Sequence, residues 1–314
     1  MLLLIQYTIL FASVLLLVAL GGCFSERSGI VNIALEGIMV LGALGGALVL
    51  KFLPISVGPF VMVTTATVAS ILLGMLCSLL LGVAAIRFKA DQTITGTAIN
   101  MLATAATTVG VKALNGALSG GKNTTSDVDY PTSKDLLLVD IAGFEFNWFM
   151  LIAVIALIVA YFVLFKTSFG LRLRACGEHP QAADSAGVSV GKMRYSGVLL
   201  SGLLGGIGGI AYVTAGVSQW KFENGIAGFG FLAMAVMIFG GWHPIKIALA
   251  ALLFGFLRAL GKVYPLFDVL VELNIPSVVY NMMPYVISLL VLILSSKNSR
   301  APKAAGIPYD KGQR

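Results

Sequence analysis

The stretch WFMLIAVIALIVAYFVLF, residues 148–165, decides the class of fold because it is long, apolar and free of charge. A helix needs about 20 such residues to cross the roughly 30 Å hydrocarbon core of a bilayer. The stretch LLLIQYTILFASVLLLVALGG at residues 2–22 has the same character. A transmembrane β-strand would instead alternate apolar and polar residues. These runs therefore predict an all-α polytopic membrane protein.

The composition of the whole chain supports this class. Of 314 residues, 58% are hydrophobic and 11% are charged, and the mean hydropathy is +0.95. An ordinary soluble domain is about 25% charged, so lipid must cover the excess apolar surface. Hydropathy predicts about nine spans, within a range of about eight to ten. The expected spans are 2–22, 30–50, 57–86, 91–114, 148–166, 195–216, 226–242, 245–262 and 279–295.

Two of these segments have unusual features. The run Leu20-Gly21-Gly22-Cys23 is similar to a lipoprotein cleavage box, but no Lys or Arg precedes Arg27, as a signal peptide would require. We therefore interpret 2–22 as the first span. The segment 226–242 is short and interrupted by glycine, which is compatible with a half-helix or with a re-entrant segment. The sequence leaves these two alternatives open.

The charged residues predict the orientation. Residues 115–147 hold five acidic residues but only Lys122 and Lys134 as bases, whereas 166–194 and the C-terminal residues are basic. Basic loops stay on the cytoplasmic side, so the net charge of +7 reflects topology rather than nucleic-acid binding. The expected organisation is a single transmembrane domain at 1–296, with an extracytoplasmic loop at 115–147, a cytoplasmic loop at 167–192 and a basic cytoplasmic tail at 297–314.

A polar stripe marks the fourth expected span. Thr93, Thr97, Asn100, Thr104 and Thr107 recur at steps of four and three, which places them on one face of a helix. A polar face is unfavourable against lipid, so the stripe is typical of a helix that lines a path for a polar solute. The alternative is that the threonines bond their own backbone and pack against neighbours. In either case Asn100 needs a partner outside its helix.

The second expected span begins GIVNIALEG and contains Glu36 and Asn32. A buried carboxylate is unfavourable unless it is paired or hydrated. Glu36 could therefore anchor a broken helix or belong to the solute path, or it could lie near the membrane interface, a few positions from Arg27. Nothing in the chain predicts an enzyme, because there is no GxxxxGK[ST] loop, no HExxH pattern and no CxxC spacing. No metal or other cofactor is expected on this chain.

The cytoplasmic loop contains a short expected helix. Pro180 suits its first turn and Gly187 its end. The residues between include Ala182, Ala183 and Ala186, which we expect on its surface, together with Ser185. Small exposed side chains suit docking against another protein, although an ordinary solvated loop helix is the alternative.

Three stretches resemble one family. GLRLRACGEHPQAADSAGV at 170–188 resembles the cytoplasmic coupling loop of ABC-importer permeases for ribose, branched-chain amino acids and nucleosides. SERSGIVNIALEGIMVLGALGG at 25–46 and GFGFLAMAVMIFGGWHP at 228–244 resemble other parts of the same family. The resemblance implies a type II ABC-importer-like permease, closest to the nucleoside (simple sugar) permeases that work with basic-membrane-protein-type binding lipoproteins.

The resemblance also implies partners and roles. A cytoplasmic ATPase, which binds ATP and Mg, would dock on the coupling helix at 177–187, a related second permease would complete a heterodimer, and an extracytoplasmic binding protein would deliver the solute. The location would be the bacterial cytoplasmic membrane. The solute would be a nucleoside, and the alternative is that the same machinery imports a simple sugar such as ribose. A secondary transporter is the alternative class of protein. His179 stands where the family commonly has Asn, so either the helix cap is weaker or another group supplies it.

Two sets of residues follow from these arguments. The expected solute path comprises Asn32, Glu36, Thr93, Thr97, Asn100, Thr104, Phe229 and Phe231, the two phenylalanines offering apolar surface for an aromatic solute. The expected coupling residues are Gly177, Glu178, His179, Pro180, Ala182, Ala183 and Gly187.

Overall fold

The computed structural model describes residues 2–130, 137–141, 143–215, 219–268, 272, 276–295 and 301–311. Expectations that rest on Lys134, Asp135, Lys297, Arg300 and Arg314 lie outside these residues. Within the described part, seven helices are long and apolar enough to cross a membrane, and two shorter apolar helices accompany them. Together they match the nine expected spans and confirm an all-α polytopic membrane protein.

The seven long helices and the shorter apolar helix α13 occupy the expected stretches, with shifted ends. They are α1 (Leu2–Arg27), α2 (Leu35–Phe52), α3 (Pro59–Gly82, continued by a π-helical turn at Val83–Arg87), α4 (Gln92–Leu118), α6 (Trp148–Lys166), α9 (Val190–Val213), α11 (Pro244–Val263) and α13 (Ser277–Ser295). Two helices extend beyond the expected spans. The helix α4 continues into the expected loop at 115–147, and α9 begins within the expected loop at 167–192. Hydropathy marks the apolar part of a helix and misses its polar end turns.

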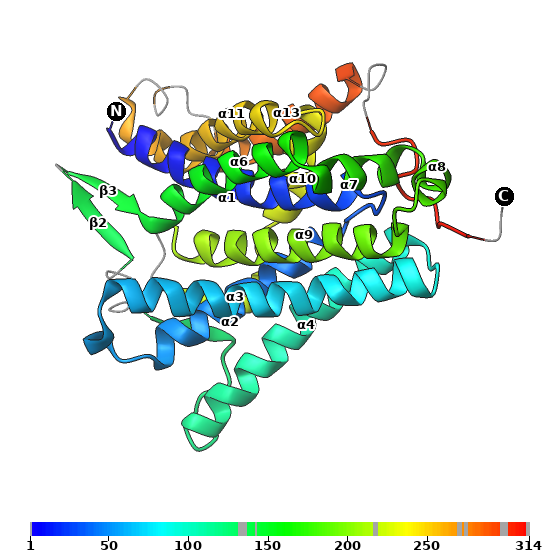
Figure 1. Ribbon diagram of the computed structural model, residues 1–314. Coiled ribbons are helices and arrows are strands. Elements are labelled where there is room, and N and C mark those ends of the chain that lie inside the picture. Colours follow the sequence, from blue (N-terminus) through cyan, green and yellow to red (C-terminus); the bar gives the residue numbers. More distant parts are fainter. Residues whose placement is uncertain are drawn as a thin grey trace.

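Short elements close the two ends of the bundle. The helices α7 (Ser168–Glu178) and α8 (Pro180–Ser185) lie at one end, which we call the α8 end. The hairpin of β2 (Leu138–Ile141) and β3 (Phe144–Asn147) lies at the other, the hairpin end, together with the N-terminus (Figure 1). A second antiparallel pair joins β1 (Asp127–Asp129) to β4 (Gln219–Lys221).

The core lies along α1, which packs against α9 and α11. Close contact between α2, α3 and α9 depends on glycine. A Cβ atom on Gly42 would lie 2.5 Å from the Cα of Gly206, and one on Gly202 would lie 2.7 Å from the carbonyl oxygen of Gly74. The glycine pairs of α2 and α9 thus let helix backbones touch, as small residues do in membrane bundles.

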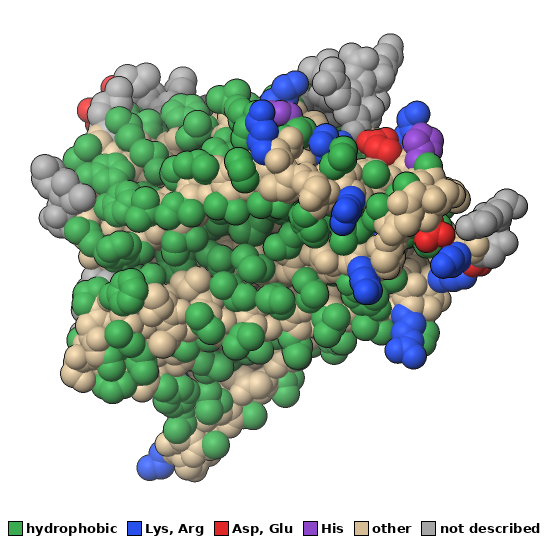
Figure 2. Space-filling model, viewed as in Figure 1, with side chains coloured by type: hydrophobic (Ala, Val, Ile, Leu, Met, Phe, Trp, Pro, Cys, Tyr) green, Lys and Arg blue, Asp and Glu red, His purple; other side chains and the backbone are tan. Residues whose placement is uncertain are grey.

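Apolar and charged side chains occupy different parts of the surface, as expected for a protein that crosses a membrane. Figure 2 shows hydrophobic side chains over the middle of the face and towards the hairpin end, while most Lys and Arg side chains of this face lie towards the α8 end. Apolar side chains on α6 such as Ile155, Ile158 and Phe162 are more than half exposed, at 51%, 64% and 59%. Lipid is the solvent that would cover them.

The segment 226–242 is a half-helix. The helix α10 (Phe229–Phe239) has 11 residues, so it is about 16 Å long, roughly half of the hydrocarbon thickness. Before it, the chain leaves β4 at the hairpin end and passes through a 3₁₀ turn at Phe222–Asn224. After it, Trp242 contacts α1 at the α8 end. The segment therefore joins the two ends of the bundle, and its membrane helix covers only Phe229–Phe239.

Candidate functional site

A cavity of about 600 Å³ lies between α4, the start of α2 and the segment that leads into α10. It is open on one side, and its size falls in the ~300–1,000 Å³ range of ligand pockets. It gathers five of the eight residues that the sequence predicts for a solute path. The lining residues are Glu36, Thr97, Asn100, Met101, Thr104, Ala105, Thr108, Val109, Glu223 and Phe231.

Glu36 holds the start of the half-helix α10. Its two carboxylate oxygens accept hydrogen bonds from the backbone N–H groups of Gly228, at 2.9 Å, and Gly230, at 2.7 Å. Unpaired N–H groups and the helix dipole make a helix N-terminus a favourable partner for a negative charge. A Cβ atom on Gly230 would lie 2.5 Å from the Cα of Glu36, so glycine is required for this approach. Glu36 is 8% exposed and both anchors α10 and lines the cavity.

Asn100 finds its partners at the start of α2 and just before it. Its Oδ1 accepts from the backbone N–H of Gly37 at 2.7 Å, and its Nδ2 donates to the carbonyl of Ile33 at 2.8 Å. These two residues flank the first turn of α2, where the chain changes from an irregular to a helical path. Asn100 therefore fixes α4 to the start of α2 at the edge of the cavity.

The threonines of α4 bond their own backbone. The hydroxyl of Thr97 donates to the carbonyl of Thr93 at 2.8 Å, and that of Thr104 donates to Asn100 at 3.1 Å. This is the alternative that the sequence allowed. Thr97 and Thr104 nevertheless line the cavity, and each hydroxyl oxygen can still accept a hydrogen bond from a solute. Thr107 is fully buried and bonds to Ala103 at 2.8 Å.

Three expected path residues lie away from the cavity. Asn32 donates from Nδ2 to Ser201 Oγ on α9 at 2.7 Å. Thr93 is exposed and lies outside the lining. Phe229 is fully buried, with its ring centroid 4.3 Å from that of Tyr212. Phe229 and Phe231 are two positions apart on α10, so they point in nearly opposite directions, and Phe231 alone faces the cavity.

Sequence reasoning missed part of the lining. The face of α4 that lines the cavity includes Met101 and Thr108, which follow helical spacing with Thr97 and Thr104. The expected stripe was selected for polar residues only. It therefore left out Met101 and included Thr107 in place of Thr108. Glu223 comes from an irregular segment far along the chain, so no helical pattern could place it. Its carboxylate pairs with Lys112 of α4. The hydrogen bond and charge of that ammonium hold the pKa of Glu223 below its ordinary value.

A second candidate site is an apolar groove of about 350 Å³ at the α8 end. Pro180 begins α8, and Gly187 follows it with a positive φ of 82°. The side chain of His179 makes no capping hydrogen bond with α8, in line with the weaker cap expected there. The groove is lined by Leu171, Arg172, Ala175, Glu178, His179, Ala182, Ala183, Ala186 and Val188.

The expected exposure of Ala183 was wrong. Ala183 is 5% exposed and packs against Cys176 and Val190 beneath the groove. Ala182 and Ala186 are exposed. Because α8 has only six residues, fewer than two turns, and lies on α7, one of its small residues must face the bundle. Burial also raises the pKa of the Cys176 thiol.

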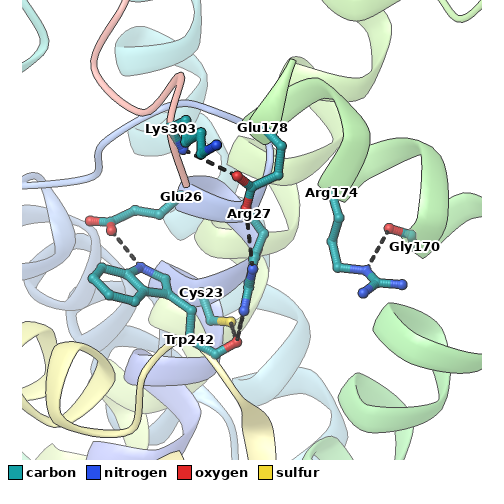
Figure 3. A network of polar contacts seen from close by, with 8 residues as sticks. All are labelled: Cys23, Glu26, Arg27, Gly170, Arg174, Glu178, Trp242 and Lys303. Carbon is teal, nitrogen blue, oxygen red and sulfur yellow. Dashed lines mark hydrogen bonds and ion pairs between the residues drawn. The ribbon is translucent and has the colours of Figure 1, made fainter. Parts of the chain in front are cut away.

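A polar network joins this groove to the bundle (Figure 3). Glu178 Oε1 lies 3.8 Å from Arg27 Nη1 at the end of α1. The guanidinium of Arg27 donates twice to the carbonyl of Trp242, at 3.2 and 3.0 Å, and the Cys23 thiol donates to the same oxygen at 3.4 Å. The indole N–H of Trp242 donates to Glu26 at 2.7 Å. The groove, α1 and the end of the α10 segment are thus connected.

The described part of the C-terminal tail packs against the same end. The N–H of Ala304 donates to Gly177 at 2.8 Å, and Arg194 donates to the carbonyl of Ile307 at 3.1 Å. Lys89 pairs with Asp310 at 2.8 Å. Residues 301–311 therefore lie across the α8 end, against α7, α9 and the connection between α3 and α4.

The family follows from the comparisons with known proteins. Residues 4–296 match the family described as the permease component of the branched-chain amino acid transport system. The chain belongs to this family of multi-pass membrane permeases, which confirms the resemblance seen in its motifs.

Individual relatives cover nearly the whole chain. It is 43% identical to the guanosine ABC transporter permease protein NupQ of Bacillus subtilis (strain 168), over 98% of this chain and 96% of the relative. It is 38% identical to the nucleoside ABC transporter permease protein NupC of Lactococcus lactis, over 97% and 96%. A putative glucose ABC transporter permease, TsgC13 of Haloferax volcanii, is 32% identical over 82% and 76%. No solved structure matches the chain.

Proposed function

We propose that this chain is the permease subunit of an ATP-driven ABC importer that takes up nucleosides. The observation that carries this proposal is the near-full-length similarity to two permeases named for guanosine and nucleosides, at 43% and 38% identity. A permease of this kind provides the path through the membrane and leaves ATP hydrolysis to another subunit. The absence of a GxxxxGK[ST] loop from the sequence supports that division of labour.

The chemistry of the cavity is compatible with a nucleoside. Nucleosides are neutral, carry many hydrogen-bond donors and present an aromatic face. Glu36 and Glu223 offer carboxylate acceptors, and Thr104 offers a hydroxyl. Phe231 is 46% exposed and offers an aromatic surface on the same cavity, as ligand pockets commonly do.

The apolar groove supports a docking role for the α8 end. We assign this end to the cytoplasm and the groove to a cytoplasmic ABC ATPase that binds ATP and Mg. The tail at 297–314 would then be cytoplasmic as well, and the hairpin end would receive an extracytoplasmic binding protein. The basic side chains towards the α8 end support this orientation (Figure 2).

A related second permease would complete the transporter. The chain matches two nucleoside permease proteins of Lactococcus lactis, NupC at 38% identity and NupB at 31% over 42% of this chain. Two different relatives from one organism support a heterodimer over a homodimer. The open side of the cavity, beside α4, is where we place the second permease.

Uptake by the assembled transporter tests the function. The permease would be reconstituted in liposomes with its partner permease, ATPase and binding protein, and radiolabelled guanosine, ribose and glucose would be offered with and without ATP. We expect ATP-dependent uptake of guanosine. ATP-dependent uptake of a sugar but not guanosine would favour the second candidate, which the Haloferax relative supports. Uptake driven by an ion gradient without ATP would contradict the ABC mechanism.

A further inference from the structure

We propose that α10 is the element that transmits movement of the α8 groove to the cavity, with Arg27 and Glu36 as the positioning residues at its two ends. This inference rests on the proposed function, because it assumes that an ATPase moves α8. It adds the route by which that movement reaches the solute path. The route runs from the groove to the end of α1, along the α10 segment, and into the cavity.

The first step joins the groove to α1. Glu178 is the last residue of α7, next to the start of α8, and its carboxylate lies 3.8 Å from Arg27 Nη1. The backbones are also in contact here, because a Cβ atom on Gly177 would collide with the carbonyl of Arg27. A displacement of α8 therefore reaches the end of α1 through both side-chain and backbone contact.

The second step joins α1 to the end of the α10 segment. The carbonyl of Trp242 accepts three hydrogen bonds, two from Arg27 and one from Cys23. Its indole ring is 4% exposed and donates to Glu26 at 2.7 Å. Hydrogen bonds from a charged guanidinium are strong, and low local dielectric strengthens them further. Figure 3 shows these partners converging on Trp242.

The third step runs along α10 itself. A hydrogen-bonded helix of 11 residues is stiff along its axis. Ala227, two residues before the helix, and Trp242, three residues after it, have positive φ angles of 51° and 53°, a conformation that non-glycine residues adopt only when their surroundings impose it. Both ends of α10 are thus held in place, and movement at one end must appear at the other.

The last step reaches the cavity. The N-terminus of α10 is bonded to the carboxylate of Glu36 through Gly228 and Gly230. Glu36 and Phe231 line the cavity from α2 and α10. A shift of α10 along its axis would therefore pull on Glu36 and move Phe231 at the same time, and so change the shape of the cavity.

A reporter in the cavity tests the route without any solute. Thr104→Cys places a thiol in the cavity lining, while the native Cys23, Cys77 and Cys176 are buried. In the transporter assembled with its ATPase, we would measure the rate at which a polar maleimide modifies Cys at position 104, with and without a non-hydrolysable ATP analogue. We expect the analogue to change this rate about five-fold or more, in the range of typical coupling between sites.

Two variants break the route and one serves as a control. Arg27→Gln removes the bonds to Trp242, and Glu178→Gln removes the ion pair at a partly exposed position. Lys192→Gln removes a charge from an exposed residue at the same end, outside the network. In both route variants we expect the ATP analogue to change the modification rate at position 104 by less than about two-fold. In the control variant the change should be as large as in the protein that carries Thr104→Cys alone. Co-purification of the ATPase confirms that each variant assembles.

Three results of this experiment bear directly on the proposed route. A full response in Arg27→Gln or in Glu178→Gln, with the ATPase bound, would overturn the proposal. If Arg27→Gln fails to assemble, Glu178→Gln alone decides. The proposal would also be overturned if the ATP analogue left the modification rate unchanged in the protein that carries Thr104→Cys alone. Because the reporter needs no solute, a failure of guanosine uptake would count against the proposed substrate and leave the route standing.

Discussion

Asn100 of α4 holds Gly37 of α2 by a hydrogen bond from the glycine N–H to the asparagine Oδ1, 2.7 Å long and buried. The same side chain donates to Ile33 at 2.8 Å. One amide thus satisfies a donor and an acceptor at the irregular start of α2. These hydrogen bonds help to shape the wall of the cavity, because they fix the separation of α4 from α2.

Replacing Asn100 by Leu should therefore destabilise the protein as well as impair transport. One buried and one partly buried backbone group would lose their partners, at about 1–3 kcal/mol for the buried one. We expect a lower melting temperature in detergent and reduced uptake, with the ATPase still bound. Thr97→Val is the matched control, because Thr97 lines the same cavity but bonds within its own helix. Wild-type melting and uptake in Asn100→Leu would contradict this role.

Glu36→Gln should loosen the start of α10. The carboxylate accepts two N–H bonds, whereas an amide offers one oxygen and turns its NH₂ group towards the other donor. Losing a bond to a charged acceptor costs about 1.5–3 kcal/mol. We expect a lower melting temperature and slower uptake. Glu223→Gln is the control, since Glu223 lines the cavity without bonding to α10, and equal stability of both variants would refute the anchoring role.

The apolar groove should lose its partner when a charge is placed in it. Ala182→Arg and Ala186→Arg put a guanidinium among apolar lining residues. Burying that charge at an interface should weaken docking about ten-fold or more, since a factor of ten is only ~1.4 kcal/mol. ATPase co-purification and ATP-driven uptake measure the effect.

The control for the groove is Gln181→Arg, on the same helix but exposed and outside the lining. Ala183→Arg is unsuitable as a docking test, because Ala183 is buried and the change would disturb the packing of α8 itself. Undiminished docking by both groove variants would show that the ATPase contacts another surface.

The glycine contact between α3 and α9 should tolerate no added methyl group. Gly206→Ala would place a Cβ against the backbone of Ser70 on α3, and overpacking of this kind costs about 1–3 kcal/mol. Gly110→Ala in α4 is the control, because a Cβ there meets nothing within 4 Å and alanine favours a helix by about 1 kcal/mol. We expect the melting temperature to fall in the first variant only.

Much of the architecture follows from local sequence. The apolar runs specified nine helical segments, and Pro180 with Gly187 marked the short helix α8. These features depend on hydrophobicity along the chain and on backbone preferences of single residues, so neighbours in sequence suffice to predict them. The helical spacing of Thr97, Asn100 and Thr104 likewise pointed to one side of α4, although it did not show which neighbouring positions complete the cavity.

The sequence by itself determined the class of protein, its repeated crossings and the motifs of its family. Only the tertiary structure decided that Glu36 anchors α10, that Glu223 reaches the cavity, that Phe229 is buried in the core and that Ala183 faces inwards. Each of these depends on contacts between residues far apart in the chain. Hydrophobicity and helical period describe one helix at a time, whereas the direction in which a side chain points depends on the helices packed around it.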